Sequence, residues 1–166
     1  MNVFKEMGFN PEQINKNEEF LYNIARTYLL FTKKFSNFYK KFRLTPAKFN
    51  ALVLIEHLGR EEGVSQIEIS EKLIVSGANI TGLIDRMEKD KLVKRIPDIK
   101  DRRLKRAKIT KKGKKLIEKI WPLHIEKTNS LIKHISNNRK NEVIRCLTEI
   151  REKLKGGDKK IQKSKL

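Results

Sequence analysis

The residues of this chain best suited to bind an anion lie in one short stretch, residues 95–110, with the sequence RIPDIKDRRLKRAKIT. Asp98 and Asp101 stand three residues apart, and Arg102 and Arg103 directly follow the second aspartate. The Pro-Asp pair favours a turn, and the short β-branched segments on either side favour strands. The stretch therefore predicts a β-hairpin with two arginines at its tip, which could bind phosphate or enter an electronegative groove of DNA.

The positive charge is distributed unevenly along the chain. The 166 residues include 39 Lys and Arg against 20 Asp and Glu, a formal net charge of +19. Residues 91–115 hold 13 basic and 2 acidic residues, so 11 of the 19 excess charges fall within 25 residues. Residues 56–71, in contrast, hold five acidic residues and one basic residue. A concentrated basic segment of this kind indicates a polyanionic partner.

The side chains that could perform catalysis or bind a metal form no recognisable set. Cys146 is the single cysteine, so neither a disulfide nor a cysteine-based metal site can form within one chain. The three histidines lack metal-ligand spacing, and no nucleophile–base set or phosphate-binding glycine loop is present. We therefore expect no enzyme, no catalytic residue, no cofactor and no metal.

The sequence gives no sign of a membrane protein. No stretch approaches 18 uninterrupted apolar residues, and the N-terminal segment lacks the apolar run of a signal peptide. We expect a cytoplasmic protein with no membrane partner.

The segments before the hairpin predict a helix-turn-helix. Thr45 is suited to cap a helix that has Pro46 in its first turn and ends at Gly59. Ser65, with Glu68 three residues later, forms a capping box for a short helix that ends at residue 74 or 75.

Ser76 can cap a further helix directly after that turn. Its buried stripe would consist of Ile80, Ile84 and Met87, which leaves small polar residues on the opposite face. Two short helices, a tight turn and a following hairpin predict a winged helix.

Longer helices are expected on both sides of this region. Thr110 should cap a long helix that Pro122 kinks or restarts, and residues 156–166 should form a flexible basic tail. Two apolar stripes recur at spacings of three and four residues and are wider than a lone winged helix needs. The first stripe consists of Phe20, Ile24, Tyr28, Phe31, Phe35, Phe38 and Phe42, and the second of Val143, Leu147, Ile150 and Leu154.

Five motifs in the middle of the chain resemble the MarR family of winged-helix transcription regulators. They are QIEISEKL from Gln66, SGANITGLIDRME from Ser76, KLVKR from Lys91, DIKDRR from Asp98 and ITKKG from Ile109. Their order and spacing agree with the family pattern over about residues 44–122. The resemblance implies a mainly α fold with a small β-hairpin wing, in which dimerisation helices at both ends flank the winged helix-turn-helix.

The same resemblance implies how the chain is divided. Residues 1–43 would form an N-terminal dimerisation helix region and residues 44–115 the DNA-binding domain. Residues 116–155 would supply C-terminal dimerisation helices, followed by the tail of residues 156–166.

Four positions depart from the family pattern. Lys91 stands where the family usually has Gly, Ser70 replaces the usual Ala, and Ile99 replaces a common Pro. Gly82 stands where many relatives carry an arginine that reads a base. This last change weakens any transfer of DNA sequence preference from relatives.

The second helix of the helix-turn-helix is expected to enter the major groove of DNA. Its first turn has small side chains, Asn79 can pair with adenine, and Ser76 and Thr81 can reach phosphate or base. The resemblance implies that Arg103 enters the minor groove and that Asp98 or Asp101 orients the arginine pair. The predicted DNA-binding residues are Ser65, Gln66, Ser76, Ala78, Asn79, Thr81, Gly82, Arg86, Arg95, Arg102, Arg103 and Lys105.

The resemblance also implies a homodimer on double-stranded DNA, at an A·T-rich pseudo-palindrome, which acts as a repressor. Family members commonly release DNA when a small aromatic or anionic ligand binds. The candidate pocket residues here are Phe31, Phe35, Phe49, Val53, His57 and Trp121. Each of them could equally belong to an ordinary core.

One alternative from a different class remains open, namely a non-sequence-specific architectural protein that binds DNA or RNA. The high charge and Gly82 favour it. Readers of RNA sequence stack bases on exposed aromatic residues, whereas the aromatic residues here concentrate in a predicted buried stripe. A basic membrane-surface helix is disfavoured because the most basic stretch is predicted to be a hairpin.

Overall fold

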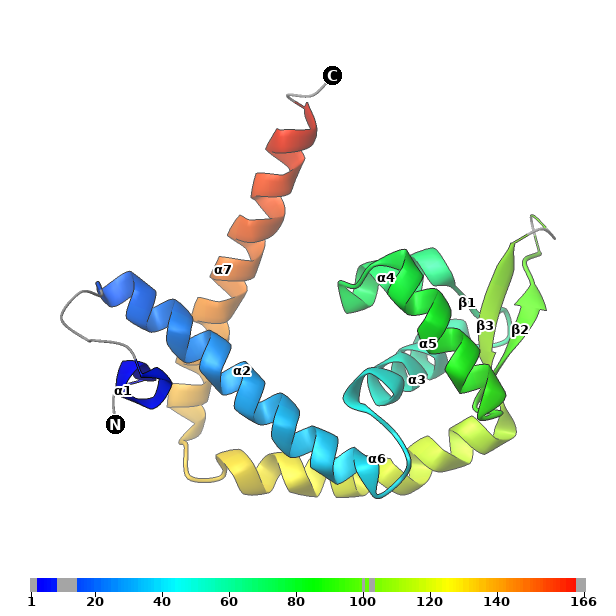
Figure 1. Cartoon of the computed structure of the whole chain (residues 1–166), viewed down its shortest axis with the longest axis horizontal. Helices are drawn as coiled ribbons and strands as arrows, with labels where there is room; N and C mark the ends of the chain where they lie inside the picture. The colour runs from blue at the N-terminus through cyan, green and yellow to red at the C-terminus, as the bar shows by residue number, and fades with distance from the viewer. Residues whose placement is uncertain (1–2, 9–14, 100, 102–103, 164–166) are drawn as a thin grey trace. The chain divides into compact units, whose positions relative to one another are not determined.

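The computed structural model describes residues 3–8, 15–99, 101 and 104–163, with side chains as far as residue 156. The chain forms two compact units, Met1–Glu118 and Lys119–Leu166 (Figure 1). The elements in chain order are α1 (Val3–Met7), α2 (Lys16–Lys40), α3 (Pro46–Gly59), β1 (Val64–Ser65), α4 (Gln66–Leu73), α5 (Gly77–Lys89), β2 (Val93–Pro97), β3 (Lys105–Ile109), α6 (Lys111–Ile132) and α7 (Asn137–Lys163).

The helix-turn-helix forms as predicted, because side chains satisfy the first free N–H groups of each helix. The Thr45 hydroxyl accepts the Lys48 N–H at 3.2 Å, and the Ser65 hydroxyl accepts the Glu68 N–H at 3.1 Å. Helix α4 ends at Leu73, slightly earlier than predicted, because Ile74 adopts a left-handed conformation with φ 54°. Ser76 then caps α5.

The wing is a three-stranded antiparallel sheet in the order β1-β3-β2. Strands β2 and β3 form the predicted hairpin, with Val93 paired to Ile109 at one end and Pro97 to Lys105 at the other. The short strand β1 pairs Val64 with Ala107 and was not predicted. Two residues are too few to show the alternation that indicates a strand.

The core of the first unit lies between α3, α4, α5 and the sheet. Leu52, Ile55, Ile69, Ile80 and Ile84 are completely buried. This packing fixes α5 against the sheet and leaves the opposite face of the helix exposed.

The aromatic stripe predicted on the first long helix is only partly buried. In α2, Phe35 is 5% exposed, while Phe20 and Tyr28 are 42% and 68% exposed. Phe42 lies beyond the end of α2. Tyr39, outside the predicted stripe, is buried and stacks on Phe49 with ring centroids 4.5 Å apart.

Two expectations for the C-terminal helices require correction. Helix α6 continues through Pro122, so it does not restart there, while the alternative of a kink stays a prediction. The missing hydrogen bond and steric clash cost about 3 kcal/mol, which a helix with many other hydrogen bonds can tolerate. Helix α7 extends to Lys163, so most of the segment predicted as a tail is helical. The Lys and Gln residues there propagate a helix well.

The division of the rest of the chain into two dimerisation regions and a DNA-binding domain stays a prediction. No helix in the described ranges combines the length and apolar character needed to cross a membrane.

Candidate nucleic-acid interface

Helix α5 has one buried face and one exposed face. Ile80, Leu83, Ile84 and Met87 are buried, at intervals of three and four residues. The residues predicted to contact DNA at its N-terminal end are all exposed, and they are Ser76, Ala78, Asn79 and Thr81. The four residues predicted to contact DNA therefore share one short exposed surface at the start of α5.

The side chain of Arg86 covers the position left open by Gly82. A Cβ atom on Gly82 would lie 3.3 Å from Nη1 of Arg86. The guanidinium therefore extends back along α5 toward its N-terminal half. Both residues were predicted to face DNA, and the Arg86 side chain lies beside the space that a side chain at residue 82 would fill.

Gln66 and Thr81 connect the two helices of the helix-turn-helix. The Thr81 hydroxyl lies 2.9 Å from Oε1 of Gln66 and 3.1 Å from the carbonyl oxygen of Gly77. Ser65, also predicted to contact DNA, uses its hydroxyl to cap α4. These side chains thus position α4 and α5 relative to each other, whether or not they also touch DNA.

The turn between α4 and α5 is held by a residue that the predicted site did not include. The Ser70 hydroxyl donates a hydrogen bond of 2.6 Å to the carbonyl oxygen of Val75. The backbone N–H of Val75 donates in turn to the carbonyl oxygen of Ser70 at 3.1 Å. The sequence indicated this role only in that Ser70 stands where the family usually has Ala.

Arg95, predicted to contact DNA, is bound to two carboxylates of α5. Its guanidinium lies 2.5 Å from Asp85 and 2.5 Å from Glu88. The Arg95 side chain is 23% exposed. Its charge is therefore balanced within the chain, and it joins the wing to α5.

Arg106 anchors the other side of the wing. Its guanidinium lies 2.8 Å from the Asp98 carboxylate and donates to the carbonyl oxygens of Glu62 and Gly63 at 3.0 and 2.9 Å. The Asp98 carboxylate also accepts the Asp101 N–H at 3.2 Å. Asp98 thus shapes the wing partly through Arg106.

The predicted arginine pair at the wing tip, Arg102 and Arg103, lies outside the described residues, so its orientation by Asp98 or Asp101 stays a prediction. Lys105, predicted to contact DNA, is exposed at the start of β3. Lys108 is bound to the Glu61 carboxylate at 2.6 Å. That hydrogen bond and charge lower the pKa of Glu61.

The residues predicted to line a ligand pocket have different environments. Phe35 and Phe49 are buried around Tyr39, with ring centroids 5.8 and 4.5 Å from it. Val53 is half-buried, while Phe31 and His57 are exposed. Trp121 belongs to the second unit, where its ring lies 5.7 Å from that of His124. The pocket stays a prediction.

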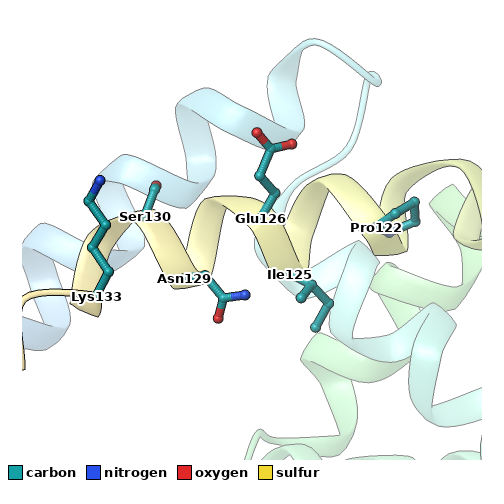
Figure 2. Close-up of a pocket in the computed structure, with 6 residues that line it drawn as sticks. All are labelled: Pro122, Ile125, Glu126, Asn129, Ser130 and Lys133. Atoms are coloured by element: carbon teal, nitrogen blue, oxygen red, sulfur yellow. The ribbon is translucent and has the colours of Figure 1, made fainter. Parts of the chain in front are cut away.

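A different hollow lies on the surface of α6. Figure 2 shows its lining, in which Pro122, Ile125 and Asn129 follow one another along the helix. Glu126, Ser130 and Lys133 complete the lining. None of these residues belongs to the predicted pocket.

The helix-turn-helix with its antiparallel wing defines a winged-helix protein, and comparisons with known proteins place it more closely. Residues 44–104 match the MarR family. The HTH-type transcriptional regulator PecS of Dickeya dadantii is 23% identical over 131 residues, which are 79% of each chain. The winged helix-turn-helix segment of this chain is therefore similar to the MarR family of transcription regulators, the family that its sequence motifs resemble.

Solved structures agree with this fold. BldR from Sulfolobus solfataricus, a transcriptional regulator, superposes with a TM-score of 0.70 at 28% identity, covering 84% of this chain and 99% of that one. MepR of S. aureus in complex with DNA gives a TM-score of 0.75 at 21% identity, with the same coverage.

Proposed function

We propose that the chain is a homodimeric, sequence-specific repressor that binds an A·T-rich pseudo-palindrome. The observation that carries this proposal is the exposed N-terminal end of α5 beside a wing braced by Arg95 and Arg106. A helix is about 10–12 Å across and fits the major groove, which is about 12 Å wide. In this proposal the protein regulates transcription in the cytoplasm and catalyses no reaction.

The first turn of α5 would read the major groove. Ser76 and Ala78 have small side chains that allow close approach, and Asn79 can form a bidentate pair with adenine. Arg102 and Arg103 would lie in the adjacent minor groove, where a narrow A·T-rich segment has an enhanced negative potential. A solved complex of MepR with DNA, whose fold this chain shares, supports the binding of DNA in this proposal.

Dimerisation would cover apolar side chains that a single chain leaves exposed. Exposed patches of this kind commonly mark interfaces. On α2 they are Phe20, Leu21, Tyr28, Leu29, Leu30 and Phe31, and on α7 they are Val143, Ile144 and Leu154. A two-fold dimer would place two copies of α5 on half-sites about 10 to 10.5 base pairs apart.

An effector would be a small aromatic or anionic molecule bound near the aromatic residues of α2 and α3. Phe31 stacks on Phe35 with ring centroids 4.8 Å apart, and Phe31 is 39% exposed. Such a surface could accept a further ring. A thermal shift with phenolic acids, followed by release of bound DNA, tests this part; a failure of every phenolic acid to shift the melting temperature contradicts it.

Selection of bound sequences from a random duplex pool at near-physiological salt tests the main proposal. Enrichment of an A·T-rich palindrome with half-sites one turn apart is expected. If each protomer neutralises about four phosphates, the dimer should show a slope of log K against log salt of about −7. A slope near zero would contradict phosphate-dominated binding.

A second candidate function is non-sequence-specific architectural binding of DNA or RNA. Gly82 favours it, because no side chain reads a base at that position. Equal affinity for the palindrome and for random duplex, with strong salt dependence retained, would support this candidate over the repressor.

A further inference from the structure

The end of the wing opposite its tip has a second group of basic side chains. There, α5 ends beside the start of α6 (Figure 1). The Thr110 hydroxyl donates to the carbonyl oxygen of Lys91 at 2.7 Å, and Nζ of Lys112 donates to that of Asp90 at 2.7 Å. Five lysines exposed around this junction form what we name the root surface: Lys89, Lys91, Lys111, Lys112 and Lys115.

The two carboxylates at the end of α5 pair with cations outside the root surface. Asp90 binds Lys48 at 2.5 Å, and Glu88 binds Arg95. Within the described part of the chain, none of the five lysines forms a salt bridge. The root surface is therefore a positive patch in which lysines outnumber the nearby carboxylates.

Several of these lysines are unfavourable for the local backbone. Lys91 has a left-handed φ of 60° directly after α5, a position that favours glycine. Lys111 and Lys112 stand in the first turn of α6, where the helix dipole disfavours positive charge. Lys111 and Lys115 are four residues apart and repel each other. Local rules are commonly broken in this way at functional sites.

The root surface lies at the opposite ends of β2 and α5 from the surfaces proposed to bind the first duplex. Strand β2 has five residues and spans about 16 Å. Helix α5 has 13 residues and separates its two ends by about 20 Å. Both lengths exceed the Debye length of about 8 Å at physiological salt, so these charges contribute little to a duplex held at the tip.

We propose that the root surface binds the phosphate backbone of a second DNA duplex, so that one protein bridges two duplexes. This inference rests on the proposed binding of a first duplex by α5 and the wing. The five residues are all lysines, which are depleted in protein–protein interfaces but act as point charges toward phosphate. They include no aromatic side chain on which a base could stack, so duplex DNA fits better than single-stranded RNA.

Capture of one duplex by another tests the proposal. The full chain is bound to an immobilised A·T-rich duplex and washed, and a labelled duplex of unrelated sequence is then added. The wild type should retain the labelled duplex with a slope of log K against log salt of about −4.5, since about five phosphates would be neutralised. The K89Q/K111Q/K115Q variant should bind the immobilised duplex normally but retain about ten-fold less labelled duplex.

Two further variants separate charge from folding. Lys91→Gly removes one charge and relieves the left-handed strain, so it should fold well and still reduce capture. K33Q/K34Q/K41Q removes three exposed lysines elsewhere in the first unit and should leave capture unchanged.

The outcomes distinguish this inference from the proposed function. If the wild type does not bind the immobilised duplex, the proposed function itself is contradicted. Normal binding without capture, or equal capture by the wild type and K89Q/K111Q/K115Q, would overturn only the second site. Capture of labelled polyglutamate but not of the labelled duplex would also overturn it, in favour of an acidic protein partner.

Discussion

Oδ1 of Asp85 and Nη2 of Arg95 lie 2.5 Å apart and join α5 to the wing. Glu88 completes the arrangement, because its other oxygen accepts the backbone N–H of Arg95 at 2.9 Å. Burial opposes the charge of Arg95, but the carboxylates of Asp85 and Glu88 outweigh burial and raise its pKa. These three contacts join the side chain and backbone of Arg95 in β2 to α5.

Replacement of Arg95 by Met should loosen the wing. The change leaves Asp85 and Glu88 without their cation, and we expect a loss of about 1–2 kcal/mol in the free energy of unfolding. Arg95→Lys should be intermediate, because an ammonium cannot hold two carboxylates in the same fixed geometry. Urea unfolding, with DNA affinity measured in parallel, checks this order.

Lys94→Met is the matched control, because it removes the same charge from the neighbouring exposed residue of β2. Equal losses of stability in Lys94→Met and Arg95→Met would contradict a bracing role for Arg95.

The parts of this structure that depend on neighbouring residues could be predicted from sequence. Ser65, Ser76 and Thr110 cap their helices because each hydroxyl meets an N–H three residues later. The exposed end of α5 followed from the spacing of its buried residues.

Contacts between distant residues could not be predicted in the same way. Glu61 and Lys108 are 47 residues apart, and only the pairing of β1 with β3 brings their segments together. Asp98 meets Arg106 because Arg106 pairs with Ile96 across the hairpin, a register that requires the strand ends to be known.

Ile74→Gly should stabilise the protein. Ile74 has a φ of 54° and is 86% exposed, so it has the backbone strain of a β-branched residue and buries almost no apolar surface. A left-handed conformation costs an L-residue about 1–2 kcal/mol, which glycine avoids. We expect a gain of about 1 kcal/mol in the free energy of unfolding, measured in urea.

Val75→Gly provides the comparison, because Val75 lies next to Ile74 but has no positive φ. Glycine at this position should lower the free energy of unfolding. If Ile74→Gly also destabilises the fold, then contacts of Ile74 outweigh its strain and the prediction is wrong.

Gly113→Ala should separate α6 from the wing. A Cβ atom on Gly113 would lie 2.3 Å from the carbonyl oxygen of Leu92 and 2.8 Å from Cγ1 of Ile109. The backbone of Leu92 would have to shift, at a cost of about 1–3 kcal/mol. A lower melting temperature is expected. Gly77→Ala is the control, because a Cβ there meets nothing within 4 Å and alanine favours a helix.

The stability of the second unit should decrease on acidification through His124. Burial lowers the pKa of His124, so the unfolded chain binds a proton more readily than the folded chain. The stabilisation by neutral His124 is therefore complete above the unfolded pKa of about 6.5 and is lost as the pH falls through the lower folded pKa. Across this pH window, the melting temperature of the wild type should fall with decreasing pH. His124→Gln should reduce this dependence, whereas replacement of the exposed His134 should leave it unchanged. An unchanged pH dependence in His124→Gln would assign the acid sensitivity to another group.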